Sequence, residues 1–365
     1  METLTHRPTE NDRLSTRLTV VDRFVPTAHR SIRIPRRKEI NLMRVWIGPH
    51  DVENLVDEKV LIRGIRSGFR ELTNTLPAPQ RFHSALAGIT QITDLAEIMI
   101  LAPGALPSIP AFTVKVHAKY PSNPTRGLPG IQGVIHLIDA ATGELLALID
   151  SPQLTAHRTA AAGAVAADLL ARPDAHSVAI IGAGVQGEWQ FKYLTHVRSI
   201  DRVWVYDLEP RNAQAYAERR QSEGYWCERA STIAAAVQDA DIIVTATWAR
   251  NPFLTASMVP SGVHIATLGP DSPGKAEIDI DLLEQARVVC DNLVLARTMG
   301  CLYPWRDRSL PAVSLTMVLR GEVPGRFDMH QRAVFGAVGL PSQDLVAAWQ
   351  VFQDALKYGR GQVLP

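Results

Sequence analysis

Short apolar runs alternate with helical segments over residues 177–291, and this alternation is the most regular pattern in the chain. Apolar runs of four to seven residues that are separated by helices indicate βαβ units and a buried parallel sheet. The pattern therefore predicts an α/β fold for this region. We expect its strands at 177–182, 202–207, 241–247, 263–269 and 286–291, the last of which completes the sheet.

Residues 76–150 show a different pattern, rich in Pro, Gly and β-branched side chains. Segments that alternate or run apolar are typical of strands, and a turn signal between two of them predicts a hairpin. We expect that turn at 141–143, and we expect strands at 112–120, 131–139 and 144–150.

Helical patterns lie on both sides of this region. Asp51 has the position of an N-cap for an amphipathic helix that reaches about Leu72. Residues 155–170 are rich in Ala and predict a closely packed helix. After about Leu310 the pattern is helical again, and we expect the last helix, 344–359, to return to the first part of the chain.

Composition excludes several classes of protein. The 365 residues include 38 Lys and Arg against 37 Asp and Glu, a balance that argues against a general nucleic-acid binder. No apolar run approaches the length of a membrane span. The three cysteines are widely spaced, which fits a cytoplasmic protein and no disulfide framework or metal site.

The first 42 residues differ from the rest, with nine basic and five acidic side chains and little apolar periodicity. We expect a disordered extension or a start codon assigned too early. An organelle presequence is the weaker alternative, because such presequences avoid acidic residues.

A glycine-rich turn follows the predicted strand at 177–182. Gly182, Gly184 and Gly187 fit the pattern G-x-G-x-x-G, with Val185 and Gln186 between the last two. After a strand and before a helix, this pattern permits a tight turn and a close approach of the backbone to a diphosphate. The sequence therefore predicts a dinucleotide site at the amino end of that helix.

The predicted coenzyme is NAD, with NADP as the alternative. Asp207 ends the next strand, 20 residues after Gly187, where a carboxylate binds the ribose hydroxyls and repels a 2′-phosphate. Arg211 weakens this preference slightly. Thr245 and Thr247 end a later strand, and either line the nicotinamide side or satisfy the strand end.

Five segments, in this order, resemble the ornithine cyclodeaminase/mu-crystallin family: residues 115–133, 154–167, 178–190, 264–279 and 338–355. The resemblance implies a Rossmann NAD-binding domain, which we expect at 166–314. It also implies an α+β substrate and dimerisation domain, which we expect at 43–165 with 315–365. A homodimer follows from the same resemblance.

The resemblance also implies a site for an α-amino or α-imino acid. Arg81, Lys115 and Arg158 correspond to the cations that bind its carboxylate, and Asp271 to the acid beside its nitrogen. Fixed cations orient a carboxylate, and a nearby acid favours a protonated imine. Lys115 has an alternative role as the proton donor.

Other residues near these motifs have less specific roles. We expect His157 to be buried and hydrogen-bonded, and Lys275 and Glu277 to be structural. Asn123 either touches the nicotinamide or substrate, or caps a turn.

Three hypotheses about the function are compatible with these residues. Cyclodeaminases for diamino acids carry a Glu before the lysine strand, where this chain has Ile100-Leu101-Ala102-Pro103. That absence favours an NAD(P)-dependent reductase of an α-imino acid, such as a cyclic ketimine, or a dehydrogenase of the amino acid. An ornithine or lysine cyclodeaminase that uses NAD catalytically is the alternative. A mu-crystallin-like binding protein without catalysis is the third.

Overall fold

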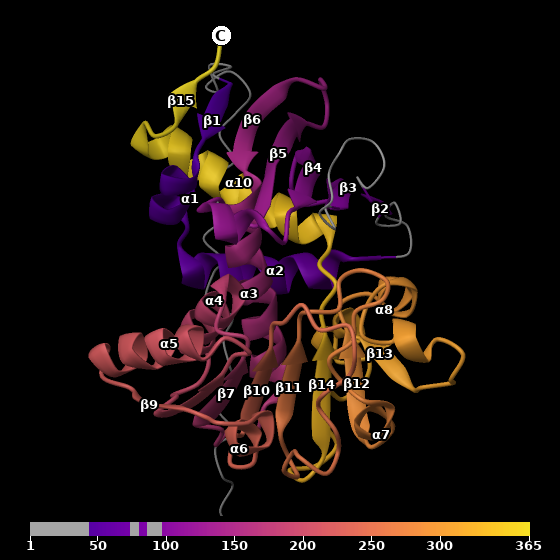
Figure 1. Cartoon of the computed structure of the whole chain (residues 1–365). Coiled ribbons are helices and arrows are strands. Elements are labelled where there is room, and N and C mark those ends of the chain that lie inside the picture. Colours follow the sequence, from indigo (N-terminus) through magenta and orange to yellow (C-terminus); the bar gives the residue numbers. More distant parts are fainter. Residues whose placement is uncertain (1–43, 74–79, 86–96) are drawn as a thin grey trace, which may run out of the picture. The chain divides into compact units, whose positions relative to one another are not determined.

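The computed structural model describes residues 44–73, 80–85 and 97–365, so the predicted disordered extension at 1–42 lies outside the described residues. Two sheets and the helices packed against them make up the described chain (Figure 1). The predicted α/β fold class is confirmed.

The second sheet is wholly parallel and has the strand order β13-β12-β14-β11-β10-β7-β8-β9. From β7 the chain proceeds to β8 on one side, and later returns to β10 on the other. Such a reversal opens a crevice at the carboxyl ends of the two central strands, where ligands bind. The strands are β7 (Ser177–Ile181), β8 (Arg202–Tyr206), β9 (Trp226–Arg229), β10 (Ile242–Thr245), β11 (His264–Thr267), β12 (Ala286–Cys290), β13 (Ala312–Ser314) and β14 (Arg332–Gly336).

The expectation that 286–291 completes this sheet is wrong. β14 lies between β11 and β12, and β13 pairs with the outer side of β12. The boundary expected at residue 314 therefore cuts across this sheet. After Arg332, the four remaining residues of β14 are buried and apolar, and so short a run has no periodicity that distinguishes a strand from a helix.

The first sheet is mixed, with the order β15-β1-β6-β5-β4-β3-β2. The predicted hairpin is present as β5 and β6, which pair antiparallel. Side chains alternate between the faces of a strand, so Lys115, His117 and Lys119 of β4 share one face, and all three are buried. The strands are β1 (Val45–Ile47), β2 (Gln80–Ala85), β3 (Glu97–Ala105), β4 (Ala111–Lys119), β5 (Ile131–Asp139), β6 (Leu145–Asp150) and β15 (Gln362–Val363).

The helix expected from Asp51 to Leu72 begins earlier, at Pro49 with Gly48 rather than Asp51 as its N-cap, and it is interrupted. It forms two helices, because Asp57 leaves the helical conformation and its side chain accepts the N–H of Val60. The predicted helix at 155–170 is confirmed as part of α3. The helices are α1 (Pro49–Leu55), α2 (Glu58–Glu71), α3 (Ser151–Leu170), α4 (Val185–Leu194), α5 (Pro210–Ser222), α6 (Ile233–Val237), α7 (Ile280–Glu284), α8 (Leu293–Thr298), α9 (Leu315–Leu319) and α10 (Pro341–Tyr358).

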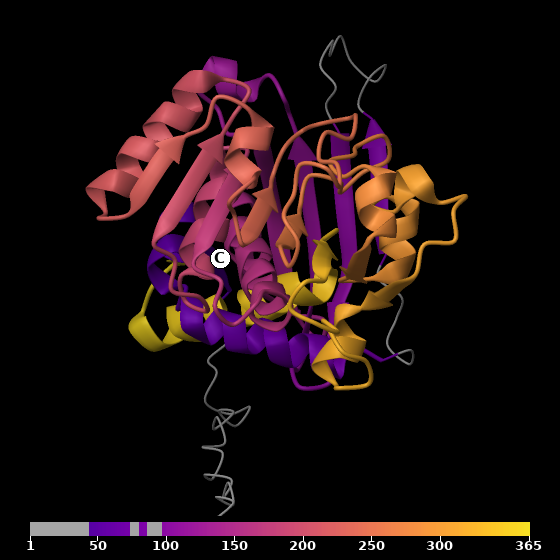
Figure 2. The ribbon, with the colours of Figure 1, turned by 90° about the horizontal axis from the view of Figure 1, so that it is seen from below.

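Helix α10 joins the end of the chain to the first sheet, as predicted. It packs against β3 and β4 and lies beside α2, an arrangement visible in Figures 1 and 2. Helix α3 contacts strands of both sheets, including β5 and β14. These two helices therefore carry side chains to the place where the sheets approach each other.

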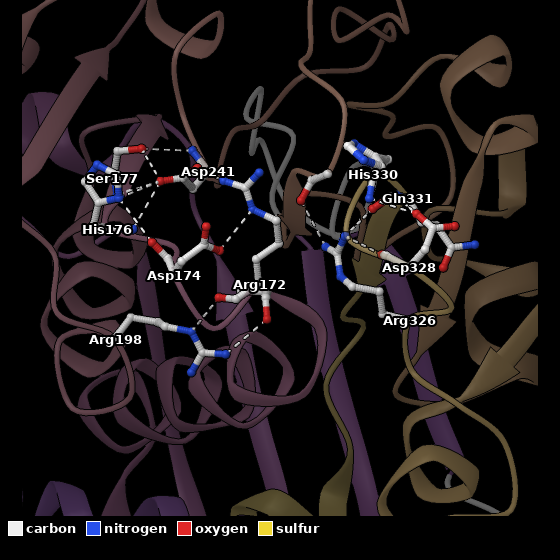
Figure 3. A network of polar contacts seen from close by, with 12 residues as sticks. Arg172, Asp174, His176, Ser177, Arg198, Asp241, Arg326, Asp328, His330 and Gln331 are labelled. Carbon is white, nitrogen blue, oxygen red and sulfur yellow. Dashed lines mark hydrogen bonds and ion pairs between the residues drawn. The ribbon is translucent and has the colours of Figure 1, made fainter.

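A polar network ties together the amino ends of the parallel strands (Figure 3). Asp241 binds Arg172 and accepts the N–H groups of His176 and Ser177. Arg326 donates to the carbonyl oxygens of Leu170 and Gly262, among others. Ligands of such sheets bind at the opposite, carboxyl ends, so we assign this network a structural role.

Candidate active site

The glycine-rich turn between β7 and α4 has the geometry that a dinucleotide requires. Gly182 has φ +103°, and a Cβ atom there would lie 2.6 Å from the carbonyl oxygen of Ala246. A Cβ atom on Gly187 would lie 2.3 Å from the carbonyl oxygen of Gly182. At Gly184 a Cβ atom would meet no described atom within 4 Å. Packing thus requires glycine at positions 182 and 187, whereas Gly184 leaves open space before the amino end of α4.

That open space suits the diphosphate of a dinucleotide. Gly184 is the N-cap of α4 and has no side chain to bind the free N–H groups of the first turn, which starts at Val185 and Gln186. Free N–H groups and the helix dipole favour an anion at this position. The residues present therefore fit the coenzyme that the sequence predicts.

Asp207 lies directly beside this turn. Its Oδ2 accepts the N–H of Ala183 at 2.8 Å and its Oδ1 accepts the N–H of Glu209 at 2.9 Å. The side chain is half-buried and stands one residue beyond the end of β8. This is the position from which a carboxylate reaches the ribose hydroxyls.

Thr245 and Thr247 contact a carboxylate of the protein. Their hydroxyl groups donate to Glu277 at 2.6 and 2.7 Å, and Thr267 donates to the same carboxylate at 2.7 Å. These contacts favour the strand-end role over a direct contact of either hydroxyl with the nicotinamide. Glu277 also accepts the N–H of Gly269, so it holds the ends of β10 and β11 together, as its predicted structural role requires.

A buried ion cluster lies where β4, α3 and α10 pack together. Lys115 Nζ lies 2.8 Å from Oδ2 of Asp344, and Arg158 Nε lies 2.9 Å from Oδ1 of the same carboxylate. Arg158 also donates to the side chain of Gln343 at 3.0 Å. Burial lowers the pKa of Lys115 to about 7, although Asp344 acts to raise it. An anionic ligand here would stabilise the charged ammonium group.

Asp271 is the centre of a second group of cations. Lys119 binds it directly, Lys275 Nζ lies 2.9 Å from Oδ1, and Arg81 Nη2 lies 3.5 Å from Oδ2. Burial alone would raise the pKa of Asp271, but the three cations hold it well below its usual range. Burial also lowers the pKa of Lys119, to about 8. At 21% exposure the Asp271 side chain is the most accessible member of this group.

Arg81 connects the two groups. Its Nη1 donates to the carbonyl oxygen of Val338 at 2.5 Å, while its buried Nε has no hydrogen-bond partner among the described residues. Asp291 accepts the N–H of Val338 and Gly339, at 2.9 and 2.7 Å. Burial raises the pKa of Asp291 to about 6 against these hydrogen bonds. The segment at 338–339 is thereby fixed beside the cations.

Two further expectations concern His157 and Asn123. His157 is buried and its Nδ1 lies 2.8 Å from the hydroxyl of Tyr193, which confirms the predicted buried and hydrogen-bonded state. The amide of Asn123 donates to the carbonyl oxygen of Pro129 at 2.9 Å, which favours the turn-capping role.

Sequence reasoning missed three members of the cluster: Lys119, Asp291 and Asp344. For Lys119 a signal existed, since it follows Lys115 by four residues on a strand and so occupies the same face. The sequence predicts a structural role for Lys275, and the structure shows that it binds the candidate site residue Asp271. No local signal marks Asp344, which lies 229 residues from Lys115 in the chain.

Residues 44–73, 80–85 and 97–365 contain neither a metal-binding group of side chains nor a membrane-spanning helix. No group of three or more His, Cys, Asp or Glu side chains in these residues is arranged to hold a metal ion. No helix in the same residues has the length and apolar character needed to cross a membrane.

The fold and the site define an α/β protein in which a Rossmann-type parallel sheet meets a second, mixed-sheet domain that carries a cluster of buried cations. Within that class, the chain belongs to the ornithine cyclodeaminase/mu-crystallin family, whose model matches residues 47–359. The resemblance seen in the sequence is therefore confirmed.

Three relatives illustrate the family's range. An ornithine cyclodeaminase of Agrobacterium fabrum is 30% identical over 86% of this chain and 86% of its own. An archaeal alanine dehydrogenase dimer with bound NAD matches 88% of this chain and 99% of its own, at 26% identity and a TM-score of 0.80. A Thermococcus litoralis Δ1-pyrroline-2-carboxylate reductase, solved with NADH and L-proline, matches 88% and 100%, at 28% identity and a TM-score of 0.81. The predicted kind of enzyme agrees with these relatives.

Proposed function

We propose that this protein is a nicotinamide-dependent oxidoreductase that reduces an α-imino acid to the amino acid, or catalyses the reverse reaction, with NAD as its coenzyme. The observation that carries the proposal is the set of buried cations Arg81, Lys115 and Arg158, in a fold whose glycine turn has room for a diphosphate. The solved reductase that resembles this chain binds NADH and an amino acid.

The cations orient the substrate. Guanidinium and ammonium groups hold an α-carboxylate in one place, and this restriction aligns the α-carbon for transfer of a hydride. Bound NADH supplies that hydride. Asp271 is ionised and accessible, so it stabilises a protonated imine, the form that accepts a hydride most readily.

Two other functions remain as alternatives, and one observation bears on the first. Strand β3 carries Ile100 and Leu101 where a diamino acid needs a carboxylate, and Leu101 is buried. This apolar segment favours a substrate without a second ammonium group over a cyclodeaminase substrate. A binding protein without catalysis has no need for an ionised Asp271 among three cations.

We further propose a cytoplasmic homodimer that prefers NAD to NADP. Asp207 beside the glycine turn supports the coenzyme preference, because its charge repels a 2′-phosphate. Cys227, Cys290 and Cys301 are free and buried, as is usual in a reducing compartment. The similar archaeal protein is described as a dimer, which supports the oligomeric state.

The test follows absorbance at 340 nm with purified protein, NADH and either pyrroline-2-carboxylate or the imine of a 2-oxo acid in ammonium buffer. We expect stoichiometric loss of NADH, and loss of turnover in Asp271→Asn but not in Lys59→Met, an exposed lysine on α2. Ammonia release from ornithine with catalytic NAD, and no net loss of NADH, would identify a cyclodeaminase. Ligand binding without either reaction would identify a binding protein.

A further inference from the structure

The substrate region carries more positive than negative charge. Among the described residues of the two ion groups, five cations face three carboxylates, which leaves an excess of two positive charges. Buried charge without a counter-charge is costly, and the lowered pKa values of Lys115 and Lys119 show that cost. One α-carboxylate balances only half of the excess.

The second cationic position is Lys119. It is 4% exposed, it lies on the face of β4 that carries Lys115, and it points to the accessible end of the cluster at Asp271. Its Nζ lies 5.6 Å from the centre of the Trp248 ring, and Lys275 Nζ lies 4.4 Å from the same centre. Trp248 follows the carboxyl end of β10 and is 55% exposed. Two lysines and an aromatic ring thus form one polar wall of this end.

Neutralisation of Asp271 does not account for Lys119. Lys275 and Arg81 lie 2.9 and 3.5 Å from that carboxylate, and Lys119 is the third cation beside this single negative charge. Burial and the repulsion from Lys275 and Arg81 together outweigh the attraction of Asp271, so the pKa of Lys119 stays lowered. A second anion at this end restores the balance.

We propose that Lys119, with Lys275, binds a second carboxylate on the substrate side chain, so that the preferred substrate is the imine of a 2-oxo dicarboxylic acid. Arg158 and Lys115 hold the α-carboxylate at the buried end, and Lys119 and Lys275 hold the distal carboxylate at the accessible end. This inference rests on the proposed function and names its substrate class.

The experiment compares substrates that differ in one charge. Oxaloacetate and its monoamide at the distal carboxyl have nearly the same shape, and in ammonium buffer each forms an imine. Pyruvate and 2-oxoglutarate complete the series and vary the chain length. For the unmodified protein with NADH, we expect kcat/KM for the better dicarboxylic imine to exceed that of the monoamide and pyruvate imines by about tenfold or more, because a charge-assisted hydrogen bond is lost without the second carboxylate.

Lys119→Met tests the residue directly. We expect it to lower kcat/KM for the dicarboxylic imine about 10- to 100-fold more than for the monoamide and pyruvate imines, since any loss that arises through Asp271 is common to all of them. Lys119→Arg retains the charge and is expected to keep the preference, and Lys59→Met is the control for an exposed lysine. Melting temperature and NADH affinity report whether each variant is folded.

Several results would overturn the inference. Equal kcat/KM for the oxaloacetate and monoamide imines in the unmodified protein would overturn it. An equal decrease of kcat/KM for all imines in Lys119→Met would also overturn it, because Lys119 would then only position Asp271. If no imine consumes NADH, the proposed function fails, and calorimetry then tests the subsite by itself. The second anion position is supported if the NADH-loaded protein binds succinate more tightly than butyrate and Lys119→Met abolishes this difference. If that variant does not fold, the difference should instead become smaller as the salt concentration rises. Equal binding would refute it.

Discussion

Replacing Gly184 by alanine places a methyl group in the open space before the amino end of α4. The backbone there has φ −85°, which alanine adopts without strain, and no described atom lies within 4 Å of the new Cβ atom. Glycine and alanine differ by less than about 1 kcal/mol as N-caps. We therefore expect the free energy of unfolding, measured by urea without coenzyme, to change by less than about 1 kcal/mol.

The same methyl group should strongly weaken NADH binding. A diphosphate that is displaced by it loses about two hydrogen bonds from the backbone, each worth about 1.5 kcal/mol for a charged acceptor. A loss of about 3 kcal/mol raises the Kd by about 150-fold. Titration of NADH fluorescence measures this change.

Gly187→Ala is the matched control. Its Cβ atom would lie 2.3 Å from a backbone oxygen and 3.0 Å from Ile180, so the helix must shift and the protein should lose about 1–3 kcal/mol of stability. Only Gly184→Ala is expected to separate coenzyme binding from folding. A Kd for NADH within threefold of the unmodified protein, or equal destabilisation by both substitutions, would refute the assigned diphosphate position.

Three further predictions follow from the buried charges. Because the pKa of Lys115 is about 7, its ammonium group is charged below that pH, and kcat/KM for the imine should fall as pH rises through about 7. In Lys115→Arg, kcat/KM should not change with pH in this range. If the variant shows the same fall as the unmodified protein, Lys115 is not the group that titrates. Asp344→Asn leaves two buried cations without their carboxylate and should lower the free energy of unfolding by about 3–5 kcal/mol in urea, whereas the exposed Asp239→Asn should have little effect. Asp207→Ser removes the charge beside the glycine turn and should lower the ratio of kcat/KM with NADH to kcat/KM with NADPH. An unchanged ratio would show that Asp207 does not determine the coenzyme preference.

The parts of the fold that the sequence predicted are those whose signals are local. The glycine turn, the strand before it and Asp207 all lie within about 30 residues, so periodicity and spacing suffice to place them. β14 could not be placed in this way, because its four apolar residues are compatible with the helical pattern around them and only pairing with β11 and β12 defines them as a strand.

Three cations of the site and the acid Asp271 were predictable from family segments, but the buried counter-charge Asp344 was not. Asp344 lies in the first turn of α10, where an acidic residue is ordinary for helix reasons alone. Its role arises only when α10 packs on β4 and α3. Thr245 and Thr247 illustrate the same limit. Their place at the end of a strand suggests a coenzyme contact, but both hydroxyl groups donate to Glu277, about 30 residues further along the chain.

The segment between β14 and α10 links the parallel sheet to the substrate cations. Its N–H groups at Val338 and Gly339 are held by Asp291 at the end of β12, and its carbonyl oxygen at Val338 accepts Arg81. Gly339 has φ +92°, and a Cβ atom there would lie 2.5 Å from Nη1 of Arg158. Arg81 and Arg158, which we propose bind the α-carboxylate, thus both lie against a segment that follows directly from the sheet at whose carboxyl edge the coenzyme is expected. Hydride transfer depends on small displacements between two bound molecules, so a rigid backbone connection between their sites serves the reaction better than flexible side chains alone.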